Sequence, residues 1–409
     1  MSFSDKKWIY FTVLGFCVLY ACTITKKVGA TRVINKAVIE MQARKTFDFD
    51  AVHFNNQFAT ARANDVLQQD DSTFAILIKP ESTPVNPSPW YAFKVWGKAG
   101  KRITIILNYA KVKHRYNPKI SYQAKVWTDI GRVNLSRDST QASFKLNLTG
   151  DTALIAAQEI ISSANSYAWM DSLARSPFIK KYVIGNSLLG NPIVALTTTN
   201  DDGKKLVVVL SRQHPPEVTG YMAMQAFVNS VTGNTPLAQA FRKQYRLVLI
   251  PLLNPDGVDE GNWRHSAAGV DLNRDWDAFK QPETQAAKQF LTKMVAHEDA
   301  KVYFGIDFHS TYHDVFYTNI DTLHTTVPGF TNKWLNAFQQ AIPGFKARVQ
   351  ASGNGGNVSK SWMMRALGTD AITYEVGDNT SRQMLRNKGR VAAEKMMDLL
   401  LKGNRRVKD

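Results

Sequence analysis

The pattern of hydrophobic residues changes near residue 150, and the two patterns predict two kinds of fold. Between residues 31 and 150, short runs rich in β-branched and aromatic residues are separated by turn formers such as Lys98-Ala99-Gly100. Short strands at this spacing are typical of a small all-β sandwich. The predicted strands are Ser72–Ile78, Trp90–Trp96, Arg102–Tyr109, Ser121–Trp127 and Ala142–Leu148.

After residue 150, continuous apolar runs alternate with segments whose apolar residues recur every three to four positions. This alternation indicates an α/β domain, a mixed and mostly parallel sheet with helices on both faces. We therefore expect a sandwich domain at 31–150, an α/β domain at 151–402 and a basic tail at 403–409. The predicted strands are Tyr182–Ile184, Pro192–Thr198, Lys205–Leu210, Arg246–Leu252, Val302–Phe308, Val315–Thr318 and Ala371–Glu375, and the predicted helices are Asp151–Arg175, Glu217–Val231, Pro282–His297, Gly329–Ile342, Lys360–Leu367 and Ser381–Lys402.

The first 22 residues have the pattern of a targeting segment. Lys6 and Lys7 precede an uncharged apolar run from Trp8 to Ala21, which is short for a membrane span and typical of a signal peptide. Its end, Leu19-Tyr20-Ala21-Cys22, resembles a bacterial lipobox. We therefore expect an exported lipoprotein held at the cell envelope, on its periplasmic or outer side, by a lipid on Cys22. Cleavage after Ala21 and a short uncleaved anchor are the alternatives.

Composition limits the chemistry that the folded part can use. Cys17 and Cys22 are the only cysteines, so the folded part has no disulfide and no thiolate metal site. This fits export, and it leaves histidine and carboxylate as the metal ligands. The formal charge is +17, which could attract nucleic acid, anionic lipid or acidic peptides. Because the basic residues are scattered and no aromatic-interleaved basic motif is present, we do not expect nucleic-acid binding.

Candidate metal ligands follow the strand predicted at Lys205–Leu210. His214 and Glu217 are three residues apart, and imidazole and carboxylate are ligands that Zn²⁺ accepts. A third ligand is expected at the same sheet edge, because chemistry collects at the carboxyl ends of parallel strands. His309 directly follows the strand predicted at Val302–Phe308. A packed core histidine is the plain alternative, and His265, His313 and His324 lie in the same domain.

Two further segments carry charged residues of possible function. One runs from Gly261 to Trp276 and holds Arg264, Asn273 and Arg274, which could bind carboxylates. Salt bridges within the loop, to Asp271 or Asp275, are the alternative. The other is the strand ending in Thr373-Tyr374-Glu375, where a glutamate needs a partner, a capping role or a catalytic role.

Five ordered motifs resemble the zinc metallocarboxypeptidases of the M14, carboxypeptidase A-like, type. They are His-x-x-Glu at 214–217, Asn-Pro-Asp-Gly at 254–257, Asn-Trp-Arg…Gly-Val-Asp-Leu-Asn-Arg at 262–274, Asp-Phe-His-Ser at 307–310 and Thr-Tyr-Glu at 373–375. The first part of the chain is similar to the sandwich that precedes the catalytic domain in cytosolic-carboxypeptidase-like members. The resemblance covers residues from about 182 to 402.

The resemblance implies a role for each motif residue. His214, Glu217 and His309 would hold one zinc ion per chain, and Glu375 would be the general base. Arg264 would stabilise the oxyanion, while Asn273 and Arg274 would bind the terminal carboxylate of the substrate. The expected activity is removal of the C-terminal residue from peptides or proteins. Cleavage of cell-wall peptides by the same chemistry and a non-catalytic binding lipoprotein are the alternatives.

The sequence departs from the family pattern in the substrate-binding region. Val349 stands before Gln350-Ala351-Ser352-Gly353, where digestive-type members have a tyrosine that covers the substrate terminus; Tyr312, Tyr317 or Tyr374 could substitute for it. Pro216 stands where many members have a substrate-binding arginine. In the segment expected to form the side-chain pocket, residues 354–362, the one cation is Lys360. It could favour an acidic terminal residue, although a solvated lysine at a helix start is the favoured interpretation.

Overall fold

The computed structural model describes residues 31–34, 37–109, 111–199, 203–297, 299–346, 348–353 and 355–405. The predicted signal segment at 1–22, with Cys22, lies outside these residues, as do residues 406–409 of the predicted basic tail. None of the helices within the described ranges combines the length and apolar character that a membrane span requires.

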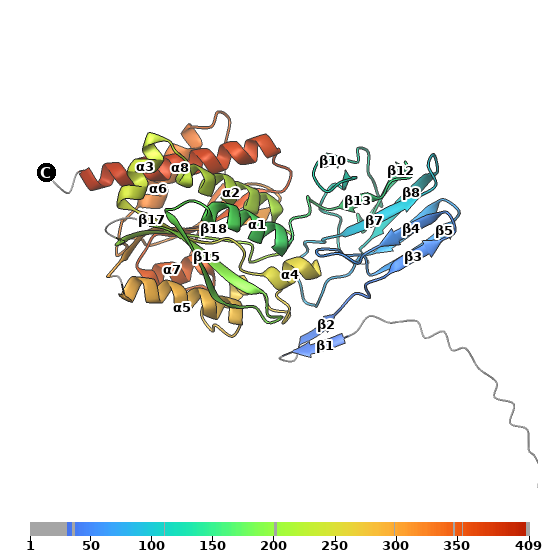
Figure 1. Ribbon diagram of the computed structural model, residues 1–409, viewed down its shortest axis with the longest axis horizontal. Coiled ribbons are helices and arrows are strands. Elements are labelled where there is room, and N and C mark those ends of the chain that lie inside the picture. Colours follow the sequence, from blue (N-terminus) through green and yellow to red (C-terminus); the bar gives the residue numbers. More distant parts are fainter. Residues whose placement is uncertain are drawn as a thin grey trace, which may run out of the picture.

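The first half of the chain forms two antiparallel-rich sheets that enclose a common core (Figure 1). In β8 (Arg102–Asn108) and β12 (Gln141–Asn147), residues alternate between buried and more exposed positions, as expected for strands with one face on a core. The six-stranded sheet has the order β10-β9-β13-β7-β4-β3 and the five-stranded sheet the order β11-β12-β8-β6-β5. The remaining strands are β3 (Thr46–Phe49), β4 (Val52–Asn55), β5 (Asp65–Asp70), β6 (Thr73–Leu77), β7 (Ala92–Gly97), β9 (Lys119–Ser121), β10 (Thr128–Asp129), β11 (Asn134–Leu135) and β13 (Ala153–Ala156), after a separate hairpin of β1 (Thr31–Ile34) and β2 (Ala37–Glu40).

The junction between the two halves differs from the sequence prediction. The predicted helix at Asp151–Arg175 is a strand at first, because β13 pairs with β7 and β9 in the sandwich. Helix α1 (Ser163–Ala174) begins later, after Ser162, whose side chain accepts a hydrogen bond from the backbone of Asn165 in a capping box. The predicted strand Ser121–Trp127 is mostly irregular, since β9 ends at Ser121.

The second half contains one eight-stranded mixed sheet, so the predicted α/β class is confirmed. Its order is β14-β15-β17-β16-β18-β21-β19-β20. The central strands β17, β16, β18 and β21 are parallel to one another, whereas β14, β15 and β19 bring in antiparallel pairs. The strands are β14 (Ile179–Asn186), β15 (Pro192–Thr198), β16 (Lys205–Ser211), β17 (Arg246–Ile250), β18 (Lys301–Thr311), β19 (Val315–Asn319), β20 (Arg348–Ser352) and β21 (Ala371–Gly377).

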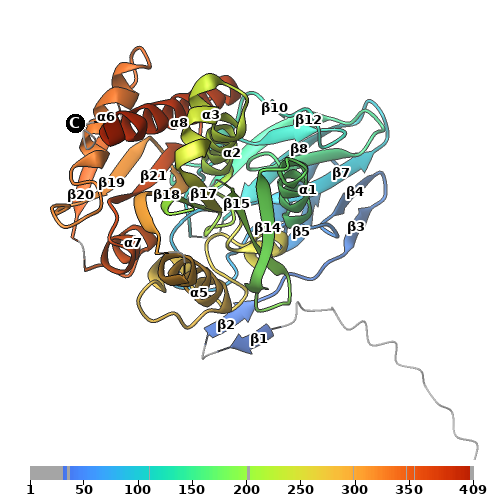
Figure 2. The ribbon, with the colours of Figure 1, turned by 60° about the vertical axis from the view of Figure 1, so that its left-hand side comes forward.

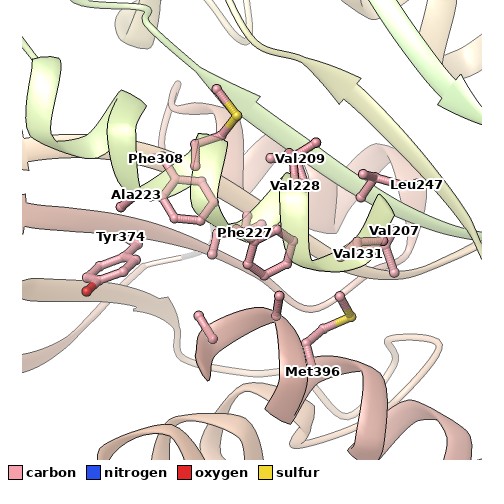
Figure 3. Close-up of a cluster of buried hydrophobic side chains, with 14 of the residues drawn as sticks. Val207, Val209, Ala223, Phe227, Val228, Val231, Leu247, Phe308, Tyr374 and Met396 are labelled. Carbon is pink, nitrogen blue, oxygen red and sulfur yellow. The ribbon is translucent and has the colours of Figure 1, made fainter. Parts of the chain in front are cut away.

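Helices cover both faces of this sheet (Figures 1 and 2). On one face, Phe227 and Val231 of α2 and Met396 of α8 pack against β16, β18 and β21 (Figure 3). On the other face, Leu291 of α5 and Met363 of α7 pack against alternate residues of the same strands. The helices are α2 (Val218–Thr232), α3 (Pro236–Gln244), α4 (Pro255–Glu260), α5 (Pro282–His297), α6 (Phe330–Gln340), α7 (Ser359–Leu367) and α8 (Arg382–Arg405), with a short 3₁₀ turn at Leu272–Arg274.

Candidate metal centre

The loop between β16 and α2 is shaped so that His214 and Glu217 face the same point. Arg212, directly after β16, is buried and adopts a positive φ of 53°, which is a strained conformation for a residue with a side chain. Its guanidinium donates a hydrogen bond to the carbonyl of Pro215 at 2.8 Å and lies over the ring of Tyr221. These contacts hold the loop in a tight turn before α2 begins.

Three buried side chains converge at the carboxyl ends of β16 and β18. His214 Nδ1 lies 2.8 Å from Glu217 Oε1, and His309 Nδ1 lies 2.8 Å from Glu217 Oε2. The two Nδ1 atoms lie 3.1 Å from each other. One ligand atom from each residue falls within 4.8 Å of the others. Among the described residues, this is the cluster of histidine and carboxylate groups that could hold a metal ion.

The outer nitrogens of both histidines are held by carboxylates. His214 Nε2 lies 2.9 Å from Asp271, and His309 Nε2 lies 2.8 Å from Asp307. Histidine ligands of zinc commonly bond a carboxylate in this way, which fixes the ring and leaves the other nitrogen for the metal. The donor set of two imidazoles and one carboxylate therefore fits zinc.

Sequence reasoning did not identify these two supporting carboxylates. Asp307 and His309 are two residues apart on one strand, so their side chains share a face, and this spacing was the available signal. Asp271 was treated as a salt-bridge partner for arginine. It is one, since Arg264 Nε donates to its Oδ2 at 2.8 Å, and its other oxygen holds His214.

The charges of this cluster depend on one another. Burial alone would raise the pKa of Glu217, but His214 and His309 hold it well below its usual range. Likewise, burial would lower the pKa of His309, yet Asp307 and Glu217 raise it well above its usual value. The two histidines and the carboxylates around them therefore favour one another's charged forms.

His309 is also fixed from behind by helix α2. A Cβ atom built on Gly220 would lie 2.2 Å from the carbonyl oxygen of His309, so the helix can approach the strand this closely only with glycine. The Ser310 hydroxyl accepts hydrogen bonds from Gly220 N at 2.8 Å and from Thr219 Oγ1 at 2.9 Å. The helix that follows Glu217 is therefore joined directly to the strand that carries His309.

Glu375 lies beside the cluster on the neighbouring strand. β18 and β21 run parallel, and their register pairs His309 with Glu375. Burial, and then the negative charge of Glu217, raise the pKa of Glu375 to about 7. Its Oε2 atom has no hydrogen-bond partner in the described protein. This oxygen is therefore available to a substrate or a water molecule.

A cavity of about 400 Å³ joins the cluster to the other predicted site residues. Arg264 and the exposed Arg274 both line it, and Asn273 is buried with its side-chain oxygen accepting a hydrogen bond from Ser359 N at 3.0 Å. His309 lies beneath the surface of the cavity and does not line it. The structure thus brings together six of the seven predicted residues in the lining: His214, Glu217, Arg264, Asn273, Arg274 and Glu375.

The tyrosine alternatives can now be separated. Tyr374 is fully buried and its hydroxyl lies 3.1 Å from Asp314, so it cannot cover a substrate. Tyr312 and Tyr317 line the cavity, whereas Val349 is not part of the lining. Three residues of the sandwich also line the cavity, Asn86, Ser88 and Arg115, and sequence reasoning missed all three.

Lys360 is not the solvated lysine that the sequence favoured. Its residue is 2% exposed at the start of α7, it lines the cavity, and its amine donates a hydrogen bond to Asn319 Oδ1 at 3.0 Å. In the described part of the chain, no carboxylate oxygen lies within 4.0 Å of this amine, so the amine forms no ion pair there. Burial lowers the pKa of Lys360 to about 8, against a raising effect of Asp370.

Comparison with known proteins agrees with this architecture. A family model described as Zinc carboxypeptidase, Peptidase M14, matches residues 166–385. Cytosolic carboxypeptidase 3 of Mus musculus is 25% identical over 341 residues, which are 73% of this chain and 33% of the relative. Cytosolic carboxypeptidase 2 of Danio rerio is 34% identical over 154 residues, covering 35% of this chain and 21% of the relative. The chain therefore spans about a third or less of the length of these two relatives.

Solved structures share the fold of both halves. A metallo-carboxypeptidase from Burkholderia cenocepacia is 19% identical with a TM-score of 0.70, covering 87% of this chain and 99% of the other. A metallo-carboxypeptidase from Pseudomonas aeruginosa, in complex with (2-guanidinoethylmercapto)succinic acid, is 20% identical with a TM-score of 0.69 over 85% of this chain. A match over 87% of 409 residues extends beyond the α/β half, so the sandwich belongs to the shared fold.

The prediction of an exported, lipid-anchored protein is wrong by this comparison. The matching relatives are named cytosolic carboxypeptidases, a name that contradicts an exported and lipid-anchored relative of this kind. The physical grounds for export were weak, because a folded part without disulfides is equally expected in a reducing compartment. The apolar run from Trp8 to Ala21 is a pattern of composition alone.

The family model spans the whole of the His214, Glu217 and His309 cluster, as well as Arg264 and Glu375. Because it matches more than half of the 409 residues, this chain belongs to the zinc carboxypeptidase family, Peptidase M14.

Proposed function

We propose that this chain is a zinc-dependent metallocarboxypeptidase that hydrolyses the C-terminal peptide bond of peptides or proteins. The observation that carries the proposal is the convergence, in one cavity, of the His-Glu-His cluster, a free carboxylate and two arginines. Each group answers one need of the reaction: metal binding, proton transfer, stabilisation of negative charge and recognition of a terminal carboxylate.

His214, Glu217 and His309 would hold one zinc ion per chain, with Asp271 and Asp307 orienting the two imidazoles. When bound, zinc supplies Lewis-acid polarisation and lowers the pKa of water. All three ligand residues are buried and their ligand atoms already lie close together, so little rearrangement of the protein is needed to bind the ion.

Glu375 would act as the general base. Its unpartnered Oε2 can accept a proton from the attacking water and return it to the leaving amine. Its raised pKa suits a group that must both take and give a proton near neutral pH, and the positive charge of a metal ion would lower that pKa.

Arg264 would stabilise the oxyanion that forms at the scissile carbonyl. Asp271 accepts its Nε hydrogen bond at 2.8 Å, so the outer nitrogens of the guanidinium remain for other partners, and Arg264 lines the cavity. Asn273 and Arg274 would bind the terminal carboxylate of the substrate, which restricts cleavage to the last peptide bond. Arg274 is exposed in the cavity, where its guanidinium can form two parallel hydrogen bonds with a carboxylate.

Lys360 supports a preference for an acidic terminal side chain. Asp370 acts on this buried cation electrostatically, but no carboxylate of the described chain lies within ion-pair distance of it, so a ligand carboxylate would offset part of the cost of its burial. The amine opens to the same cavity as Arg274 and Glu375. We therefore propose that a C-terminal glutamate or aspartate places its side-chain carboxylate at Lys360.

The comparisons give no support to the two alternatives, cleavage of cell-wall peptides and a non-catalytic binding protein. The relatives with printed activities are named carboxypeptidases.

The proposed function is tested with purified protein and synthetic peptides that differ only at the C-terminus. We expect about one zinc ion per chain, release of the terminal amino acid, and loss of this activity with a chelator. Peptides with an amidated C-terminus should be poor substrates, and Arg274→Ala should remove most of the difference between free and amidated peptides. A wild-type protein that contains zinc but releases no amino acid from any peptide would refute the proposal.

A further inference from the structure

A buried carboxylate of the sandwich half accepts hydrogen bonds from the segment that carries Arg264. Glu81 follows β6 and is 1% exposed, although it belongs to a residue type that is rarely buried. Its Oε2 accepts a hydrogen bond from Trp263 N at 2.7 Å, and its Oε1 accepts hydrogen bonds from Arg264 N at 3.1 Å and His265 N at 2.8 Å. A single side chain therefore binds three successive backbone amides of the other half of the molecule.

This arrangement fixes the backbone of Arg264 from one side. Three consecutive amides that point to one carboxylate form an anion-binding concavity, and hydrogen bonds to an ionised acceptor are stronger than neutral ones. His265 adds a fourth contact, since its Nδ1 lies 3.1 Å from Glu81 Oε1. Burial alone would raise the pKa of Glu81, but His265, Arg62 and the Trp263 amide lower it, so the group is ionised at neutral pH.

Further contacts fix residues 261–263 against the sandwich. The Trp263 side chain is fully buried in the sandwich core. Arg62, also buried, donates hydrogen bonds to the Gly261 carbonyl and to Asn262 Oδ1, both at 2.8 Å. Residues 261–263 are thus anchored in the sandwich, and the next side chain, that of Arg264, turns into the cavity of the other half.

The side chain of Arg264 is held at its other end by the metal site. Its Nε donates to Asp271, the aspartate whose second oxygen holds His214. Arg264 is therefore fixed between Glu81 at its backbone and Asp271 at its guanidinium. We propose that Glu81 is a positioning residue for Arg264, so that the sandwich is a working part of the catalytic site, an inference that rests on the proposed carboxypeptidase function.

The expected consequence of losing the carboxylate is a rate defect without a binding defect. In Glu81→Gln, an NH₂ group must face one of the three amides, so the concavity loses an acceptor and the Arg264 backbone is free to move. The loss of one oxyanion donor lowers kcat by about 10²–10³-fold. Because Glu81→Gln would displace such a donor without removing it, we expect kcat to fall by roughly tenfold or more. KM should change little, because the terminal carboxylate is bound by other residues.

A double-mutant cycle distinguishes positioning from general support of the fold. If Glu81 acts through Arg264, then Glu81→Gln should cost less than about twofold in kcat when it is added to Arg264→Ala. Full additivity of the two losses would overturn the proposal. Glu159→Gln is the matched control, because Glu159, in the connection between β13 and α1, also binds a distant residue of the α/β half, Arg382, and no hydrogen bond joins it to the Arg264 segment. It should leave kcat unchanged.

Two further measurements keep the result decisive. Amide hydrogen exchange of residues 263–265 should accelerate in Glu81→Gln while zinc content stays near that of wild type; unchanged exchange would contradict the anchoring role. If Glu81→Gln does not fold, Glu81→Asp replaces it in the same cycle, since the shorter carboxylate retains the charge but not the reach. A wild type without activity would refute the proposed function itself, whereas an active wild type with additive losses would refute only the role of Glu81.

Discussion

Replacing Lys360 with glutamine should remove the preference for an acidic terminal residue. In the wild type, the amine donates hydrogen bonds to Asn319 Oδ1 at 3.0 Å and to Ser361 Oγ at 3.5 Å, and Lys360 lines the cavity. Glutamine is close in length and retains a donor for Asn319, but it carries no charge. The variant thus changes the charge of the pocket more than its shape.

The size of the effect follows from the burial of this charge. Two unit charges 4 Å apart interact by about 4 kcal/mol at an effective dielectric constant of 20, which is an upper bound because the substrate carboxylate loses its water. Hydrogen bonds to charged groups contribute about 1.5–3 kcal/mol net, or about 10–100-fold. We therefore expect kcat/KM to favour peptides ending in glutamate over the same peptides ending in glutamine by about 10–100-fold, and Lys360→Gln to bring this ratio near one.

The preference should also depend on pH. Burial lowers the pKa of Lys360 to about 8, so the amine is charged below this pH and becomes neutral above it. Because kcat/KM reports the free enzyme, the glutamate-to-glutamine ratio should be full below pH 8 and decline as the pH rises through about 8. The decline should come from a fall in kcat/KM for peptides ending in glutamate, a fall that peptides ending in glutamine should not share.

The assay measures the release of the terminal amino acid from the paired peptides across pH 6–10, with zinc content checked for each protein. Lys333→Gln is the control, since Lys333 is an exposed lysine of α6 that should leave the ratio unchanged. A ratio that survives Lys360→Gln, or a wild type that prefers basic or aromatic terminal residues, would refute the reasoning.

Three other substitutions test the zinc site and its supports. Glu375→Gln should lower kcat by about 10²–10⁴ because it removes the proton acceptor, while zinc content is retained; a loss of less than tenfold would exclude the general base. Asp307→Asn should weaken zinc binding by about 10–100-fold, measured by competition with a chromogenic chelator, since the carboxylate that holds His309 becomes an amide; unchanged affinity would contradict this. Gly220→Ala should destabilise the fold by about 1–3 kcal/mol, measured by denaturant unfolding, because its Cβ would overlap the His309 carbonyl; Gly403→Ala, in open space, is the control and should not destabilise.

The regular elements of the α/β half could be predicted because each is long and strongly patterned. Helix α5 (Pro282–His297) and strand β15 (Pro192–Thr198) have the predicted bounds. The prediction failed where a local pattern was overridden by its partners. Ala153–Ala156 occurs in a segment with helical spacing, but it forms a strand because it can pair with β7 on one side and with β9 on the other. Strand β20 (Arg348–Ser352) was missed because it is short and its residues are largely exposed, so its alternation of polar and apolar residues is weak.

The candidate metal ligands were expected to lie together for a different reason. They lie at or just after the carboxyl ends of the neighbouring parallel strands β18 and β16, and the family motifs give their order. The supporting residues could not be predicted, because their function lies in distant contacts. Lys360 begins a helix, where a lysine is usually solvated, but here it is buried and its amine donates a hydrogen bond to Asn319 of β19, a contact that the local pattern does not reveal. Glu81 binds backbone amides, which every residue but proline possesses, so no side-chain pattern identifies its partners.

The position of the cavity at the junction of the two halves also limits the form of the substrate. Arg115 of the sandwich lines the cavity while its Nε donates to Asp378, three residues beyond Glu375, at 2.8 Å, and its guanidinium lies under the ring of Tyr312. Part of the cavity wall is therefore formed by the sandwich and is held to the α/β half by a buried ion pair. A cavity of about 400 Å³ has room for a few residues of extended chain. A flexible C-terminal tail can enter this cavity, but a terminus packed against its own fold cannot. We therefore expect the accessibility of the tail to decide first which proteins are substrates, and the identity of the terminal residue to decide second.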